Sequence, residues 1–339
     1  MNTQHNLSFL EHMSPLLVQV ELTEACNLKC KFCYNSQKPK YSDRIFEILE
    51  TLSKQGVMQV NLTGGEPLKH PQFFDILKKA CSLFPNVILL SNGSLMTTPV
   101  LKRLHEHNLL STNISIHGDA EHHDSLTQVK GSFESSISAI KYYLKANKIL
   151  VASNFVLNAY NFNQLQPTIL YLSKLGLKYM TITRFIPVGV GQNVPELELD
   201  RDQLVKAFNI IHKHNSSGLS PHIEVAEATP FCCLPEETRY LANCCSYGFD
   251  RFYVDVNGEL LVCGLSRIPV GGNILEKSLY DIKKGSEVFQ SFIKDEHLHI
   301  GCKNCDELFL CRGGCRASAL VNGSWKGTKD PQAVAPIIH

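Results

Sequence analysis

The chain has 339 residues, of which 44% are hydrophobic, enough to bury one large domain and one small one. Its 33 basic and 32 acidic side chains nearly cancel, so the composition does not indicate binding to nucleic acid or to a membrane surface. No apolar run approaches the roughly 18 residues of a membrane-spanning helix, and residues 1–15 lack the pattern of a secretory signal, so we predict a soluble, cytoplasmic protein.

The first cysteines follow the first predicted strand, Leu16–Leu22. Cys26, Cys30 and Cys33 form a C-x3-C-x2-C array. Thiolates that converge from one short loop are typical ligands of an iron–sulfur cluster or a zinc ion. Three ligands leave one coordination position open, which is typical of a catalytic site. The alternative is a zinc loop that a distant fourth ligand completes.

Predicted strands and helices then alternate as far as about Pro187. Further strands are expected at Val57–Thr63, Asn86–Ser91, Thr112–His117, Ile149–Leu157 and Tyr179–Ile186, and helices at Ser42–Gln55, Pro71–Leu83, Thr98–His107, Ser132–Ala146 and Phe162–Leu175. Six strands in this alternation imply an α/β fold with a parallel sheet, either open or closed into a barrel. Ligands of such sheets bind at the carboxyl ends of the strands.

Polar and glycine residues stand at several of these strand ends. The paired glycines of Thr63-Gly64-Gly65-Glu66-Pro67 would let the backbone approach a ligand closely. Ser91-Asn92-Gly93 and Ser115-Ile116-His117-Gly118 follow the next two strands, and Asn154 and Arg184 lie near the ends of the last two. Taken alone, the glycine pair and the Ser-Asn-Gly segment are equally compatible with ordinary tight turns.

The cysteine density rises after a predicted helix at Asp200–His214. Two adjacent pairs, Cys232-Cys233 and Cys244-Cys245, precede a hairpin predicted around Asn257-Gly258, with strands at Phe252–Val256 and Glu259–Val262. A helix predicted at Leu279–Lys294 leads to four more cysteines: Cys302, Cys305, Cys311 and Cys315. In a reducing compartment, clustered cysteines are more often metal ligands than disulfides. A zinc ribbon is the alternative here, and Cys81 is most simply a packed core residue.

The N-terminal cysteine loop, with Phe32 before its last cysteine, resembles the radical S-adenosylmethionine (radical SAM) enzymes. The resemblance implies a partial (β/α)6 barrel. It also implies that Cys26, Cys30 and Cys33 hold three irons of a [4Fe–4S] cluster whose fourth iron binds SAM. Reductive cleavage of SAM would then yield a 5′-deoxyadenosyl radical that abstracts hydrogen from the substrate.

The resemblance also implies contacts to SAM. Gly64, Gly65 and Glu66 match the family motif that contacts the methionyl amino group. The remaining contacts it implies are Phe32, Ser91, Asn92, Ser115, Asn154 and Arg184. Where relatives carry an arginine after a His-Asp pair, this chain has Thr127, so either Lys130, His117 or Arg184 supplies the positive charge or that anchor is absent.

The later cysteines resemble the SPASM domain, which binds two auxiliary [4Fe–4S] clusters. The resemblance assigns the first cluster to Cys245, Cys263 and Cys315 plus one of Cys232, Cys233 and Cys244, and the second to Cys302, Cys305 and Cys311. Adjacent side chains on an extended backbone point to opposite faces, so we expect one ligand from each cysteine pair.

The last cysteine of the SPASM pattern has no counterpart here. In relatives it follows an Asp-Pro pair, whereas Asp330-Pro331 is followed by Gln332-Ala333. We therefore expect the second auxiliary cluster to have three protein thiolates and one open iron, with a spare upstream cysteine as the alternative fourth ligand.

These patterns predict four segments. They are an N-terminal extension over residues 1–15, a radical SAM partial barrel over 16–195, a bridging helix and strand over 196–230, and a small cysteine-rich SPASM-like domain with its β-hairpin over 231–339.

The resemblance predicts an enzyme that modifies an unactivated C–H bond, with peptide maturation by epimerisation, cross-linking or thioether formation as the favoured reaction. If the reaction inverts a stereocentre, spare thiols of Cys233 and Cys244 would return hydrogen to the substrate radical; the alternative is that they are extra cluster ligands. Tailoring of a haem-type tetrapyrrole and sulfatase maturation are the alternatives, and a zinc scaffold or an iron–sulfur electron carrier is the non-enzyme alternative. Expected partners are a peptide or small-molecule substrate, a reductant such as flavodoxin or ferredoxin, and a separate leader-peptide-binding protein, because the predicted barrel begins near residue 16.

Overall fold

The computed structural model describes residues 15–36, 38–246 and 251–334. The predicted N-terminal extension therefore lies outside the described residues, apart from Pro15. None of the described helices combines the length and the apolar character needed to cross a membrane.

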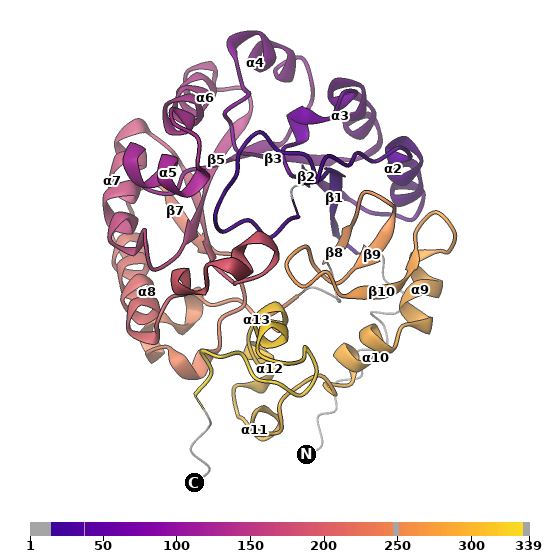
Figure 1. Cartoon of the computed structure of the whole chain (residues 1–339), viewed down its shortest axis with the longest axis vertical. Coiled ribbons are helices and arrows are strands. Elements are labelled where there is room, and N and C mark those ends of the chain that lie inside the picture. Colours follow the sequence, from indigo (N-terminus) through magenta and orange to yellow (C-terminus); the bar gives the residue numbers. More distant parts are fainter. Residues whose placement is uncertain (1–14, 37, 247–250, 335–339) are drawn as a thin grey trace.

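One ten-stranded sheet organises the chain, with the strand order β10-β9-β8-β1-β2-β3-β4-β5-β6-β7. Its strands from β1 to β7 pair in parallel and curve around a central space (Figure 1). This confirms the predicted parallel sheet, whose bounds are β1 (Leu17–Thr23), β2 (Gln59–Gly64), β3 (Asn86–Ser91), β4 (Ser111–Ser115), β5 (Leu150–Leu157), β6 (Tyr179–Arg184) and β7 (His222–Val225).

The helices that connect these strands lie on the outside of the sheet (Figure 1). They are α2 (Ile45–Lys54), α3 (Phe73–Leu83), α4 (Thr98–Leu104), α5 (Ala120–Thr127), α6 (Ser132–Ala146), α7 (Leu165–Leu175) and α8 (Arg201–Ser216), with short 3-10 turns η1 (Pro67–Lys69), η2 (Phe162–Gln164), η3 (Gly189–Asn193) and η4 (Pro195–Leu197). Helix α8 begins with the capping box of Asp200 and Gln203. Helix α5 was not predicted from the sequence.

Several predicted helices differ in their bounds, and for two of them the structure shows a local cause. The first begins at Ile45 and not at Ser42, because the Ser42 amide donates to Leu22 O at 3.0 Å and so continues the end of β1. The predicted helix at Leu279–Lys294 is two helices, α9 (Leu279–Gly285) and α10 (Glu287–Ile293). Ser286 separates them, because its hydroxyl accepts a hydrogen bond from the Phe289 amide and caps the second helix.

The cysteine-rich C-terminal segment continues the sheet. Strand β8 (Arg251–Val254) pairs in parallel with β1. Strand β9 (Glu259–Leu261) pairs antiparallel with β8, which confirms the predicted hairpin. Strand β10 (Pro269–Asn273) completes the edge. Arg267 also pairs with the fully buried Glu21 of β1 at 3.3 Å. The remaining short elements are η5 (Phe231–Cys233), η6 (Glu236–Leu241), α11 (Ile300–Lys303), α12 (Leu308–Cys311) and α13 (Arg316–Val321).

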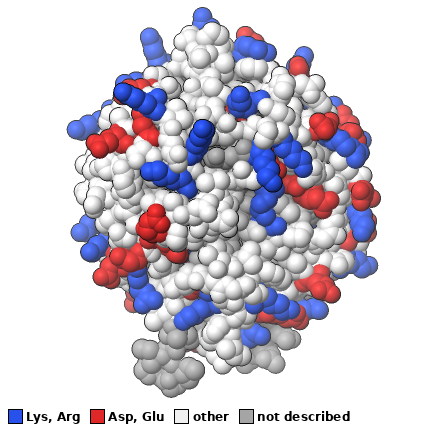
Figure 2. All heavy atoms as spheres, in the orientation of Figure 1, with Lys and Arg blue, Asp and Glu red and all other residues white. Residues whose placement is uncertain are grey.

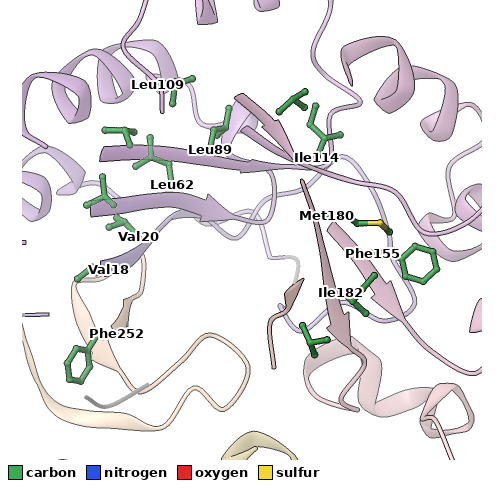
Figure 3. Packing of buried hydrophobic residues seen from close by; sticks show 14 of the residues in the cluster. Val18, Val20, Leu62, Leu89, Leu109, Ile114, Phe155, Met180, Ile182 and Phe252 are labelled. Carbon is green, nitrogen blue, oxygen red and sulfur yellow. The ribbon is translucent and has the colours of Figure 1, made fainter. Parts of the chain in front are cut away.

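The hydrophobic core runs without interruption from this segment into the barrel. Phe252 of β8 belongs to the same buried cluster as Val18 and Val20 of β1 and Phe155 of β5 (Figure 3). Along the parallel strands, apolar side chains alternate with polar ones, because successive residues of a strand point to opposite faces. The apolar face packs on the helices, and the polar face is left for the interior.

Candidate active site

A single cavity of about 1290 Å³ follows the inner, polar face of the sheet. It is lined by the N-terminal cysteine loop and by cysteines of the C-terminal segment, namely Cys26, Cys30, Cys33, Cys244, Cys245, Cys263 and Cys315. Two groups of thiols that are far apart in the sequence therefore face one chamber. On the side of the molecule that Figure 2 shows, acidic and basic side chains are interspersed over the surface.

The N-terminal cysteine loop is held by backbone hydrogen bonds from two other loops. The amides of Lys29 and Lys31 donate to Thr127 O at 3.1 Å and Leu126 O at 2.9 Å, both at the end of α5. From the other side, the Gly191 amide donates to Cys33 O at 3.0 Å. The unpredicted helix α5 thus fixes the loop that carries the first three thiols.

The three thiols of this loop lie close enough to influence one another. Burial, with a smaller contribution from neighbouring thiols, raises the pKa of Cys26 to about 11 and that of Cys30 well above its usual value. Without metal they are therefore neutral, and metal binding would release their protons. The chemistry of this donor set fits an iron–sulfur cluster with three protein ligands.

The cysteine groups are not arranged to bind a single metal ion. Across the described ranges 15–36, 38–246 and 251–334, no three His, Cys, Asp or Glu side chains converge closely enough to bind one ion. The thiolates of a four-iron cluster lie farther apart than the ligands of one ion, because each binds a different iron.

The glycine pair after β2 packs directly against the start of the cysteine loop. The Gly65 amide donates to Thr23 O at 2.6 Å, and the Glu66 amide donates to Ala25 O at 2.9 Å. Gly64 has a φ of +145°, and a Cβ there would overlap Thr23 O. Only glycine permits this approach, so the pair is more than an ordinary tight turn.

We expect Gly64→Ala to lower the free energy of unfolding by about 1–3 kcal/mol from backbone strain alone, with a steric penalty added. Because the shifted loop would line the cavity beside Cys26, SAM affinity should fall as well. Gly218→Ala is the control, since Gly218 also has a positive φ, of +69°, but a Cβ there meets no atom within 4 Å. Urea unfolding and equilibrium SAM binding would test this. Equal effects of the two substitutions would contradict the close-approach argument.

The resemblance places Glu66 at SAM. In the structure Glu66 is fully buried, and both oxygens of its carboxylate accept hydrogen bonds from the protein. It accepts hydrogen bonds from Ser91 Oγ and the Asn92 amide, both at 2.9 Å, and from the Leu68 amide at 3.2 Å. Burial raises its pKa to about 7, and these hydrogen bonds oppose that rise. Glu66 and Ser91 therefore join the ends of β2 and β3, and the predicted direct contact of this carboxylate with SAM stays a prediction.

Asn92 connects the Glu66 carboxylate to the cysteine loop through hydrogen bonds. Its Nδ2 donates to Asn27 Oδ1 at 3.1 Å and lies 3.8 Å from Cys26 Sγ. The other predicted SAM contacts on the inner face, Phe32, Ser115 and Asn154, all line the cavity. The structure thus brings the residues from four strand ends to one place, as expected from the parallel sheet.

His117 and Arg184, considered from the sequence as sources of the positive charge, both line the cavity and both have partners within the protein. His117 is buried, and its burial together with the stacked His123 holds its pKa well below the usual range, so it is neutral. Arg184 forms a buried ion pair with Asp330, with Nη2 and Oδ2 2.7 Å apart. Asp330 in turn accepts the Cys315 amide at 3.0 Å. Arg184 therefore ties β6 to the C-terminal cysteines.

The later cysteines separate into two groups. In the first, burial raises the pKa of Cys315, and its neighbours Cys245 and Cys263 raise it further. Glu227 lies beside Cys263, and burial raises the pKa of Glu227 to about 8. This first group opens to the cavity.

The second group contains Cys302, Cys305 and Cys311, and the structure adds Cys232 to it. Burial raises the pKa of Cys232, and the neighbouring thiols of Cys311 and Cys305 contribute to the rise. The sequence had placed Cys232 among the competitors for the first group, and had left a spare upstream cysteine as the alternative fourth ligand of the second group.

The two predicted hydrogen donors are in different surroundings. Cys244 lines the cavity. Cys233 is buried, its thiol donates to Pro230 O at 3.0 Å, and it is not among the cavity-lining residues. Of the two, Cys244 alone could meet a substrate in the cavity.

Comparison with protein families agrees with this geometry. Residues 20–172 match the radical SAM superfamily, and residues 244–306 match the SPASM iron–sulfur cluster-binding domain. The chain is a radical SAM enzyme with a SPASM domain. The first match contains the cysteine loop and the glycine pair, and the second contains the hairpin and part of the late cysteine array. The predicted family, enzyme class and cofactors, an iron–sulfur cluster with SAM and auxiliary iron–sulfur clusters, are thereby confirmed.

Among curated relatives of this radical SAM chain is the sporulation killing factor maturation protein SkfB of Bacillus subtilis, 27% identical over 89% of this chain and 71% of that protein. The AdoMet-dependent heme synthase of Methanosarcina barkeri is 26% identical over 91% of this chain and 93% of that protein. Among solved structures, Streptococcus suis SuiB bound to precursor peptide SuiA superposes with a TM-score of 0.77 at 17% identity, covering 96% of this chain and 77% of SuiB. The likeness to SuiB establishes the fold.

Some contributors to the site had no signal in the sequence. The backbone acceptors Leu126 and Thr127, the Glu21–Arg267 pair and the Arg184–Asp330 pair all join segments that are distant in the chain. Arg184 and the Asp330-Pro331 pair were noted from the sequence, but nothing in the sequence indicated that Arg184 and Asp330 are partners.

Proposed function

We propose that the chain cleaves SAM reductively and uses the resulting 5′-deoxyadenosyl radical to abstract hydrogen from a C–H bond of a peptide. The observation that supports this most directly is the shared cavity, where the N-terminal cysteine loop and the first auxiliary group face each other. A radical formed at one end could act on a substrate held near the other. The SAM-binding cluster supplies the electron that cleaves SAM.

The size and lining of the cavity suit SAM and the clusters together with a substrate. Its volume of about 1290 Å³ exceeds the range of about 300–1,000 Å³ typical of small-molecule pockets. Beyond the cysteine loop its walls carry amide and hydroxyl side chains, including Asn61, Asn113 and Thr181. Such groups can hydrogen-bond to the amides of a peptide backbone.

In this proposal the chain's own residues position the reactants. Cys26, Cys30 and Cys33 hold the cluster that binds SAM, and the glycine pair places the backbone at the end of β2 beside the methionyl end. Glu66 and Ser91 orient Asn92 towards the cysteine loop. The first auxiliary cluster is assigned to Cys245, Cys263 and Cys315, and an external reductant such as flavodoxin or ferredoxin supplies the electrons.

The relatives support two substrate classes. SkfB is named for maturation of a killing factor, and SuiB is bound to a precursor peptide in its structure, which favours a peptide. The heme synthase, matched over 93% of its own length, makes tetrapyrrole tailoring the second candidate. Recognition of a peptide through a separate leader-binding protein is part of the first proposal.

The test is an anaerobic assay with SAM, dithionite and short peptides encoded beside the gene. Formation of 5′-deoxyadenosine together with a modified peptide would support the proposal. In mass spectra, a cross-link or thioether appears as loss of two hydrogens, and an inverted centre appears as uptake of one solvent deuterium. Turnover of a haem precursor with no change in any peptide would transfer the assignment to the second candidate.

If the peptide is epimerised, we expect Cys244→Ala to stop the return of hydrogen to the substrate radical, because Cys244 lines the cavity. The variant should still cleave SAM, but the product should no longer acquire solvent deuterium. Cys233→Ala is the control and should behave as the parent does, because its thiol is turned to Pro230 O. Unchanged deuterium uptake by Cys244→Ala would exclude it as the donor.

A further inference from the structure

Cys232 meets the three cysteines of the second auxiliary group although it lies far from them in the sequence. The amide of its neighbour Phe231 donates to Cys311 Sγ at 3.4 Å. The thiols of Cys311, Cys232 and Cys305 lie close enough to Cys302 to contribute to its raised pKa. Those of Cys311 and Cys305 contribute in the same way to the raised pKa of Cys232. Four sulfur atoms from two distant segments therefore form one group.

The segment that lacks the expected last cysteine passes the same point. The backbone of Val334, shortly after Asp330-Pro331, hydrogen-bonds to the sulfur of Cys232. The segment before Cys232 and the segment at Asp330 also pack against the same residue, Gly314. A Cβ on Gly314 would lie 2.7 Å from Pro230 Cγ and 3.0 Å from Asp330 Cβ. The Cys232 thiol thus lies beside the C-terminal segment in which the last cysteine of the SPASM pattern is missing.

The adjacent thiol does not compete for this position. Cys233 is buried, and its sulfur is hydrogen-bonded to Pro230 O within its own turn. Cys232, by contrast, is exposed. The turn η5 therefore separates the pair, so that one member faces Cys302, Cys305 and Cys311 and the other packs inward.

We propose that Cys232 is the fourth protein ligand of the auxiliary cluster held by Cys302, Cys305 and Cys311. The thiol releases its proton to solvent and its sulfur bonds to the fourth iron, with no change in oxidation state. This deepens the proposed function and rests on the second auxiliary cluster that the resemblance to the SPASM domain assigns to the chain. The cluster then has no iron free for substrate, in contrast to the open iron expected from the sequence. None of these four cysteines lines the cavity, which agrees with a role in electron transfer or stability.

Thiol alkylation of the unmutated, full-length holoprotein tests this ligand without any effect on folding. An exposed free cysteine reacts readily with iodoacetamide, whereas Cys232 bound to iron should react at least about tenfold more slowly until the iron is chelated. Cys81, half-buried on α3 outside both groups, is the internal reference whose rate should change little. Equal labelling of Cys232 before and after removal of iron would overturn the proposal.

A second test uses variants of the full chain in a background with Cys26, Cys30 and Cys33 replaced by alanine, so that all remaining iron is auxiliary. Adding Cys232→Ala should lower the iron content from about eight per chain by between about one and four, and the oxidised sample should show the electron paramagnetic resonance signal of a three-iron cluster. Cys233→Ala is the matched control and should change neither quantity.

An unchanged iron content and spectrum in Cys232→Ala, or a loss confined to Cys233→Ala, would overturn the inference. A background that contains no auxiliary iron would overturn it as well. The results for Cys232→Ala and Cys233→Ala leave the proposed function standing, because SAM cleavage and peptide modification by the unmutated chain are measured separately. Absence of all auxiliary iron would instead also remove the first auxiliary cluster assigned there.

Discussion

Replacement of Cys26, Cys30 and Cys33 by alanine is expected to abolish reductive cleavage of SAM. The three thiols converge from one loop that is held by α5 and by Gly191, and no other side chain of that loop can replace three iron ligands. Iron content should fall by about four per chain, the content of one cluster. The measurement is formation of 5′-deoxyadenosine from SAM and dithionite under anaerobic conditions.

The control for this triple variant is Cys81→Ala. Cys81 lies on α3, away from the cavity, and its replacement should leave cleavage unchanged. Formation of 5′-deoxyadenosine by the triple variant at the parental rate would refute the assignment of these three ligands and, with it, the proposed function.

The second large effect is expected for Asp330→Ala. Asp330 is 0% exposed and Arg184 is 4% exposed, and the variant would leave the guanidinium buried without its partner. Burial lowers the pKa of Arg184, but the charge and hydrogen bonds of Asp330 more than offset this, so the arginine stays charged. Breaking such a pair costs about 3–5 kcal/mol. The Cys315 and Gln332 amides would also lose their acceptor.

Urea unfolding of the anaerobic holoprotein measures this loss. Arg44→Ala is the control, because Arg44 pairs with Glu47 at 2.6 Å but both side chains are more than half exposed, and such surface pairs contribute little. A paired replacement of Arg184 and Asp330 by leucine should recover part of the lost stability, since no buried charge then remains. If Asp330→Ala were no more destabilising than Arg44→Ala, the buried pair would not be what fastens the C-terminal segment to β6.

Local patterns were sufficient for most of the barrel. Strand β3 and helix α6 have the predicted bounds, because a period of two or 3.6 residues along a buried face is visible in any single stretch of sequence. The hairpin around Asn257-Gly258 was likewise predicted from its turn residues alone. The prediction failed where a side chain competes locally with the helix, as at Ser286, which ends one helix and caps the next.

The sequence by itself determined the chemistry of this protein: the spacing of the cysteines, the glycine pair and the alternation of strands and helices identify a radical SAM enzyme with a SPASM domain. Only the tertiary structure decided which segments of the chain come into contact. The pairing of β8 with β1, the capture of Arg184 by Asp330 and the place of Cys232 beside Cys302, Cys305 and Cys311 all depend on which distant segments come together. Such contacts form when the whole core packs, and no periodicity within either segment encodes them.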